Sequence, residues 1–152
     1  MRKVVTLSIF SVFLVACAST DTAEVSVEEP IQYIDLTLDN KKELIDDYWV
    51  VEKRQDAKYP ISAAIKGLSG CVDLIVGIKN DGKSGGYKVK KSYPKGVFDK
   101  HAAAALTKWK WVPADKNGDS VPVLTTIQFD FMAGGSINKK EAESQCGFSH
   151  DL

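Results

Sequence analysis

The chain has 152 residues, with 20 basic and 20 acidic side chains and a formal net charge of zero. A near-neutral chain has no general attraction for polyanions, so we expect no nucleic-acid partner. The length fits one domain preceded by a leader, because single domains commonly have about 100–150 residues.

The first 16 residues have the features of a secretory signal. Arg2 and Lys3 precede an apolar run over residues 4–15 that is too short to cross a bilayer. Residues 14–17, Leu-Val-Ala-Cys, resemble the lipobox of bacterial lipoproteins, whose cysteine receives diacylglycerol and becomes the new N-terminus. We therefore expect a signal peptide at 1–16 and a lipid anchor on Cys17. The alternative is an ordinary signal with a chance cysteine.

The residues after Cys17 indicate where the protein is anchored. By the sorting preference of lipoproteins, Ala18 and Ser19 favour the inner leaflet of the outer membrane, on its periplasmic face. Removal of the signal leaves 18 basic and 20 acidic residues, a formal charge of −2. Residues 17–30 comprise the lipid-bearing cysteine and an acidic, flexible tether that extends to about 45 Å.

Cys71 and Cys146 remain once Cys17 carries lipid. An even number of cysteines in an exported chain favours a disulfide, and two free thiols are the alternative. Closing a loop of about 75 residues would stabilise the fold by ~4 kcal/mol in the chain-entropy model.

Residues 31–58 form a lead-in to the domain. Asn40–Glu43 has capping-box spacing, and apolar residues then recur at helical intervals. We predict a helix over about Asn40–Tyr48, followed by an extended stretch.

Five elements are predicted within residues 59–131. Pro60 begins a short helix that ends before Gly70, and period-two alternation predicts strands at 71–79, 87–93 and 121–131. An alanine-rich run predicts a helix from Phe98 to Trp111, stopped by Pro113. We expect an α+β fold, with helices on one face of a small three-stranded antiparallel sheet. The order is helix-strand-strand-helix-strand, and residues 132–152 form a polar tail.

This pattern resembles the C-terminal domain family of TonB. The resemblance is carried by Tyr59, Pro60, Ala63, Gly70, Val72 to Ile78, Asp81, Gly82, Phe98, Asp99, Ala102 to Ala105, Trp109 to Pro113, Asn117, Gly118 and the closing strand to Phe131. It implies a periplasmic module that grips a short extended segment of an outer-membrane transporter by adding it to the last strand. Elementary chemistry agrees, because a sheet edge offers unpaired N–H and C=O groups to a guest strand.

The expected partner-binding residues follow from this resemblance. In the last strand they are Val121, Val123, Leu124, Thr125, Thr126, Ile127, Gln128 and Phe129. In the family, residues up to and including the Tyr-Pro pair also touch the transporter, which here implies Arg54, Gln55, Asp56, Tyr59 and Pro60. TonB itself has a motor-coupled membrane helix and a Pro-rich spacer. Neither pattern occurs here, so we expect an accessory role and not energy transduction by this chain alone.

Catalysis, cofactors and metals are not expected. His101 and His150 have no partners at metal-ligand spacing and no nucleophile arrangement around them. Four lysines between residues 88 and 95 form a basic strip. An envelope lipoprotein that uses the fold as a scaffold and contacts peptidoglycan is therefore the alternative function. A homodimer formed by edge pairing is a third possibility.

Overall fold

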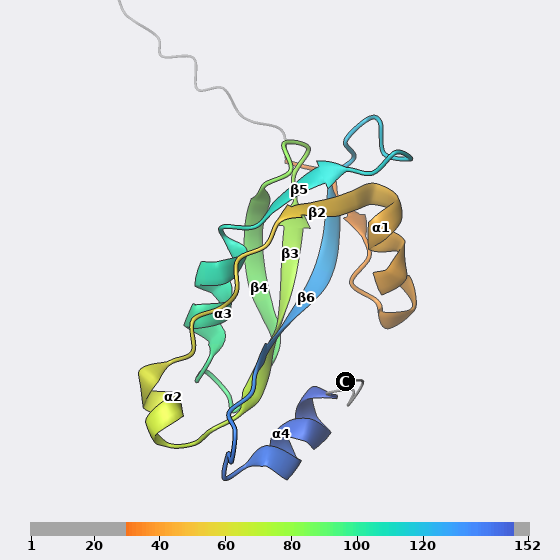
Figure 1. Ribbon diagram of the computed structural model, residues 1–152. Helices are drawn as coiled ribbons and strands as arrows, with labels where there is room; N and C mark the ends of the chain where they lie inside the picture. The colour runs from red at the N-terminus through yellow and green to blue at the C-terminus, as the bar shows by residue number, and fades with distance from the viewer. Residues whose placement is uncertain (1–29, 148–152) are drawn as a thin grey trace, which may run out of the picture.

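The computed structural model describes residues 30–147 (Figure 1). The expected signal peptide, Cys17, most of the tether and His150 lie outside these residues. The elements are β1 (Ile34–Asp35), the 3-10 helix η1 (Asp39–Leu44), α1 (Ile45–Tyr48), β2 (Trp49–Lys53), α2 (Ile61–Ile65), β3 (Gly70–Ile78), β4 (Ser84–Tyr93), α3 (Asp99–Leu106), β5 (Lys110–Pro113), β6 (Val123–Phe131) and α4 (Lys139–Cys146). Within residues 30–147, no helix has the length and apolar character needed to span a membrane.

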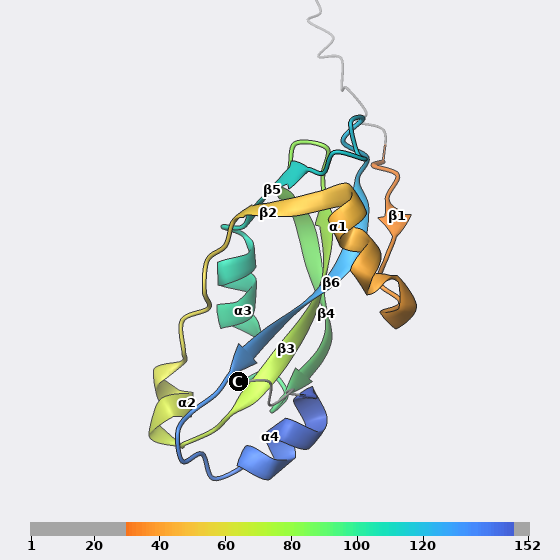
Figure 2. The same cartoon turned by 45° about the vertical axis from the view of Figure 1, so that its right-hand side comes forward.

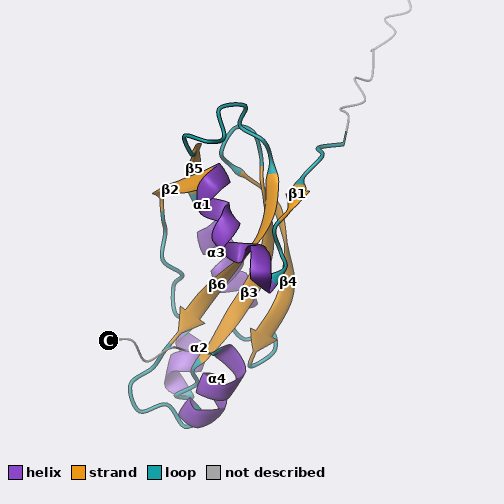
Figure 3. Cartoon of the chain, turned by 90° about the vertical axis from the view of Figure 1, so that its right-hand side faces the viewer, coloured by secondary structure: helices purple, strands orange, loops and turns teal. Residues whose placement is uncertain are grey.

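The strands form two sheets where one was predicted. The larger sheet has the order β1-β6-β3-β4, and β2 pairs with β5 in a separate antiparallel sheet (Figure 3). The mixed α+β class is confirmed, but the three-stranded sheet is wrong because it omits β1, which pairs in parallel with the start of β6. The extended stretch predicted after Tyr48 is β2, and its partner is β5.

The helices were predicted to lie on one face of the sheet, but they lie on both faces of the larger sheet. Val72 of β3 shares a buried core with Ala102 of α3, so α3 covers the face towards which Val72 points. Cys71 points to the opposite face, because neighbouring strand residues alternate, and it is bonded to Cys146 of α4. Figures 1 and 2 show α3 and α4 on either side of the strands. The disulfide is present, and the tail that it holds is partly helical.

Helix α3 ends at Leu106 and does not continue to Trp111 as predicted. Trp109 and Trp111 are buried while Lys110 and Val112 are exposed, which is the period of a strand. Strand β2 supplies a partner for this segment, so pairing between distant residues prevails over the helical spacing seen locally.

The main core lies between α3 and the inner face of the larger sheet. Val72, Leu74, Val76 and Ile78 of β3 are fully buried in it, and each such side chain contributes about 1.5–3 kcal/mol by leaving water. Phe98 at the start of α3 stacks on Phe131 at the end of β6, with 4.4 Å between ring centroids. The core thus fixes β6 along its inner side and both of its ends.

Candidate partner-binding edge

Strand β6 presents different side chains on its two faces. It pairs with β3 in continuous antiparallel register from Val123 to Phe131. Val123, Thr125 and Phe129 are buried and Ile127 is partly buried against the core. Leu124, Thr126 and Gln128 occupy the opposite face. Only some of the predicted binding residues are therefore accessible through their side chains.

Val121 precedes β6, and both of its backbone groups are already hydrogen-bonded. Its N–H donates to Oδ1 of the buried Asn117 at 2.8 Å, and its carbonyl accepts from Nε1 of Trp49 at 2.9 Å. Asn117 also donates to the Tyr48 carbonyl, which ties the loop before β6 to α1. Val121 therefore positions the strand and offers no free backbone group to a partner.

The outer edge of β6 is occupied at its beginning by the chain's own lead-in. Ile34 N–H donates to the Pro122 carbonyl at 3.0 Å, and Leu36 N–H donates to the Leu124 carbonyl at 2.8 Å. Figure 2 shows β1 lying along this side of β6. Because backbone groups alternate in direction along a strand, even-numbered residues of β6 point away from β3. Of this even-numbered series, Pro122 and Leu124 accept hydrogen bonds from residues 34 and 36.

The rest of this edge is open within residues 30–147. Thr126, Gln128 and Asp130 continue the outward-pointing series, and no backbone hydrogen bond to their outward groups occurs among the described residues. The Gln128 side chain instead donates to Oδ1 of Asp130 at 2.8 Å and to the Cys146 carbonyl at 3.0 Å. We call Thr126, Gln128 and Asp130 the free edge.

The lead-in is held on β6 by side chains as well as by its backbone. Leu36 is only 2% exposed and is the one fully buried residue from Pro30 to Tyr48. The Tyr33 ring lies over Gly77 of β3, where an added Cβ would come within 2.9 Å of it. Lys90 Nζ donates to the Thr37 carbonyl at 3.1 Å and fixes the exit of the strand.

Strand β4 forms the other edge of the sheet and is protected against pairing. Its exposed lysines are Lys88, Lys90 and Lys91, and its register with β3 shifts twice. Lysines and bulges at an edge both disfavour the addition of another strand. Lys90 and Lys91 also donate to carbonyls of the lead-in and α4, so part of the predicted basic strip binds within the chain. The free edge on β6 carries no such lysine.

The structure brings part of the second predicted contact segment next to β6. Trp109 Nε1 donates to the Gln55 carbonyl at 2.9 Å, and the Trp109 ring lies 5.5 Å from that of Phe129. The Arg54 guanidinium lies over the Trp109 ring, 5.2 Å from its centroid. Arg54 and Gln55 are therefore joined to the core face of β6 through one tryptophan.

Tyr59 and Pro60 serve the interior and not the surface. Tyr59 meets Phe98 and Phe131 edge-on, at 5.6 and 5.9 Å, and its hydroxyl donates to the Leu68 carbonyl. Burial raises the pKa of the Tyr59 hydroxyl. Pro60 is buried at the N-cap of α2. Of the five predicted residues, Arg54 and Asp56 are the exposed ones.

A metal site is not formed within residues 30–147, where no three His, Cys, Asp or Glu side chains are grouped to hold an ion. The candidate site is the row of outward backbone groups on β6. Sequence reasoning missed the part that limits it, namely β1 with Tyr33 and Leu36. The alternation of Ile34, Leu36 and Leu38 with polar neighbours is the signal that could have revealed this strand.

Known proteins show the same domain. Residues 55–132 match the family described as the Gram-negative bacterial TonB protein C-terminal. Protein TonB of Pseudomonas aeruginosa is 32% identical over 73 residues, which are 48% of this chain and 21% of that protein. The solution structure of the Pseudomonas aeruginosa TonB C-terminal domain aligns with a TM-score of 0.51 at 26% identity, over 59% of this chain and 91% of that one. The chain thus spans about a fifth of the TonB relative, and it belongs to the TonB C-terminal domain family.

Proposed function

We propose that the free edge binds an extended segment of a partner protein as an added strand. The observation that carries this proposal is the row of outward backbone groups at Thr126, Gln128 and Asp130, which have no backbone partner within residues 30–147. A guest strand would satisfy each N–H and C=O, at about 0.5–1.5 kcal/mol net per hydrogen bond. Its alternate side chains would set specificity.

The family supports an outer-membrane transporter as the source of that segment. On this proposal, the lipid on Cys17 anchors the chain at the inner leaflet of the outer membrane, and the domain works on the periplasmic face as a non-enzymatic accessory of transport. Arg54 and Asp56 would contact the same partner, because their segment lies beside β6 through Trp109. No catalytic step is required.

The lead-in limits the length of the guest. The free edge from Thr126 to Asp130 extends over about 16 Å at the rise of a β-strand. A guest that continued towards Leu124 would meet β1, which already uses that carbonyl. Longer guests would therefore have to displace residues 34–36, so binding and release of the lead-in are coupled.

A proline at position 128 tests the free edge with little effect on the sheet interior. Gln128 N–H points away from β3, so Gln128→Pro removes one outward donor and leaves the β3 ladder intact. Gln128→Ala is the matched control, because it loses the same side-chain bonds and keeps the N–H. A photoreactive residue at the exposed Asp130 position reports capture in cells, whereas Thr125 is buried and unsuitable.

We expect a discrete crosslinked protein with the Gln128→Ala chain and loss of that product with Gln128→Pro, at equal thermal stability. Binding of a synthetic peptide copying the crosslinked segment should show the same difference. Equal crosslinking by the two variants would mean that backbone pairing at this edge does not hold the partner.

A further inference from the structure

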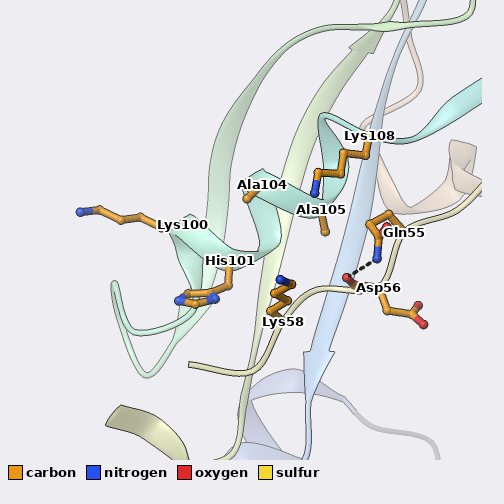
Figure 4. A pocket seen from close by; sticks show the side chains of 8 residues that line it. All are labelled: Gln55, Asp56, Lys58, Lys100, His101, Ala104, Ala105 and Lys108. Carbon is orange, nitrogen blue, oxygen red and sulfur yellow. Dashed lines mark hydrogen bonds between the residues drawn. The ribbon is translucent and has the colours of Figure 1, made fainter. Parts of the chain in front are cut away.

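A second surface lies between residues 55–58 and α3, where there is a hollow of about 180 Å³ (Figure 4). Ala104 and Ala105 of α3 line it together with the segment's own residues. A cavity of about 150 Å³ accepts a benzene ring, so the hollow has room for one branched or aromatic side chain. It is separate from the free edge, which belongs to β6.

The rim of this hollow is basic. Lys58, Lys100 and Lys108 line it, and the ion pairs among the described residues involve other lysines. Figure 4 shows the ammonium groups of Lys58 and Lys108 turned towards the alanine-bearing face of α3. The one carboxylate of the lining, on Asp56, points away and lies 3.9 Å from Arg54. The ammonium groups of Lys58 and Lys108 thus border an apolar floor without internal neutralisation, while the Lys100 side chain extends away from it in Figure 4.

We infer that the hollow binds an acidic, extended segment of a partner protein. One apolar side chain of the segment would rest on Ala104 and Ala105, and carboxylates on either side of it would pair with Lys58 and Lys108. The floor requires an apolar group of side-chain size, and the rim requires negative charge on both sides of that group. This inference does not rest on strand addition, because none of these residues belongs to β6.

The probe is a short fluorescent peptide with a central leucine flanked on each side by two acidic residues. Its anisotropy is followed as the purified full chain is added, first at low and then at rising salt. Two matched peptides keep the length: one replaces leucine by serine, and the other replaces each carboxylate by its amide. We expect saturable binding of the first peptide alone, weakening as salt is raised.

Variants of the chain locate the binding. Lys58→Gln and Lys108→Gln should each weaken the affinity by about two- to fivefold, since exposed charge pairs are worth little individually. Ala104→Glu should abolish binding, because it places a negative charge on the exposed floor, where it would repel the acidic peptide. Lys88→Gln removes the same charge on the opposite face of the sheet, where Lys88 lies near Tyr33 and Ile75, and should leave the affinity unchanged.

Several results would overturn the inference. Equal weakening by Lys88→Gln would show a general charge effect, and equal binding of the amide peptide would remove the role of the lysines. Binding to phosphatidylglycerol vesicles through Lys58 and Lys108, without peptide binding, would assign the hollow to a membrane instead. Loss of peptide binding in Gln128→Pro would place the peptide on β6, whereas unchanged binding there keeps the two surfaces distinct.

Discussion

Replacing Leu36 by alanine should release residues 34–36 of the lead-in from β6 while the rest of the domain, including β2, stays folded. Leu36 is 2% exposed, and every other residue from Pro30 to Tyr48 is at least partly exposed. The lead-in strand is therefore attached by the buried Leu36, by the strand's backbone hydrogen bonds to Pro122 and Leu124, by the Tyr33 ring and by Lys90, which donates to the Thr37 carbonyl. Leu38→Ala is the matched control, because Leu38 is 57% exposed and lies two residues further on.

The free energy that holds the lead-in strand on β6 can be estimated from these contacts. The two hydrogen bonds contribute about 0.5–1.5 kcal/mol each, and Leu→Ala at a buried site costs about 2–5 kcal/mol. Ordering the residues of the lead-in opposes these terms by about 1–2 kcal/mol per residue, so its attachment is weak. A loss of about 2 kcal/mol shifts the local opening equilibrium some 30-fold, because each 1.4 kcal/mol is a factor of ten.

Hydrogen exchange measured by mass spectrometry reads this opening directly. The amides of Ile34 and Leu36, which donate to β6, should exchange about 30-fold faster in Leu36→Ala and at the original rate in Leu38→Ala. Amides of β3 should be unaffected. If the amides of β3 accelerated together with those of the lead-in, the two would open as one unit and the reasoning would be refuted.

Three further predictions concern contacts on the outer face of the sheet. Gly77→Ala would drive a methyl group against the Tyr33 ring, so it should raise capture of a guest strand by loosening the lead-in, measured by crosslinking from position 130. Cys146→Ala should cost about 2–5 kcal/mol in urea unfolding and remove the effect of a reductant, whereas an unchanged effect would count against the disulfide. Burial raises the pKa of Asp73 despite nearby lysines, so its carboxylate destabilises the fold near neutral pH, and this cost is relieved as pH falls through the raised pKa. Asp73→Asn should therefore raise the melting temperature at pH 7 and lose that gain at pH 3; an equal gain at both values would contradict the assignment.

The local sequence pattern was sufficient to predict strands in which buried and exposed residues alternate. The strands now seen as β3 and β6 were predicted within two residues at their ends, since Val72 to Ile78 and Val123 to Phe131 show a plain period of two. The disulfide followed from the count of cysteines left in an exported chain.

The errors arose where a distant partner decides the structure. Trp109 fits a helical stripe with Phe98 and Ala102, which extended the predicted helix to Trp111, but residues 110–113 pair with β2 as β5. Strand β1 has two residues and gains its structure from Leu36 entering the core beside β6; the alternation at residues 34–38 indicates a strand but does not name its partner. The site was affected in the same way, because the position of β6 was predictable and its partial coverage was not.

The asymmetry between the two margins of the sheet limits the assemblies that this domain can build. Among residues 30–147, β4 carries lysines and an irregular register whereas the free edge of β6 carries neither, so of these two strands the larger sheet has one suited to backbone pairing. A unit with a single such place can close a pair, with another protein or with its own copy, but it cannot propagate. Growth into a cross-β fibre needs two complementary edges, so the lysines and irregular register of β4 also disfavour polymerisation through the larger sheet.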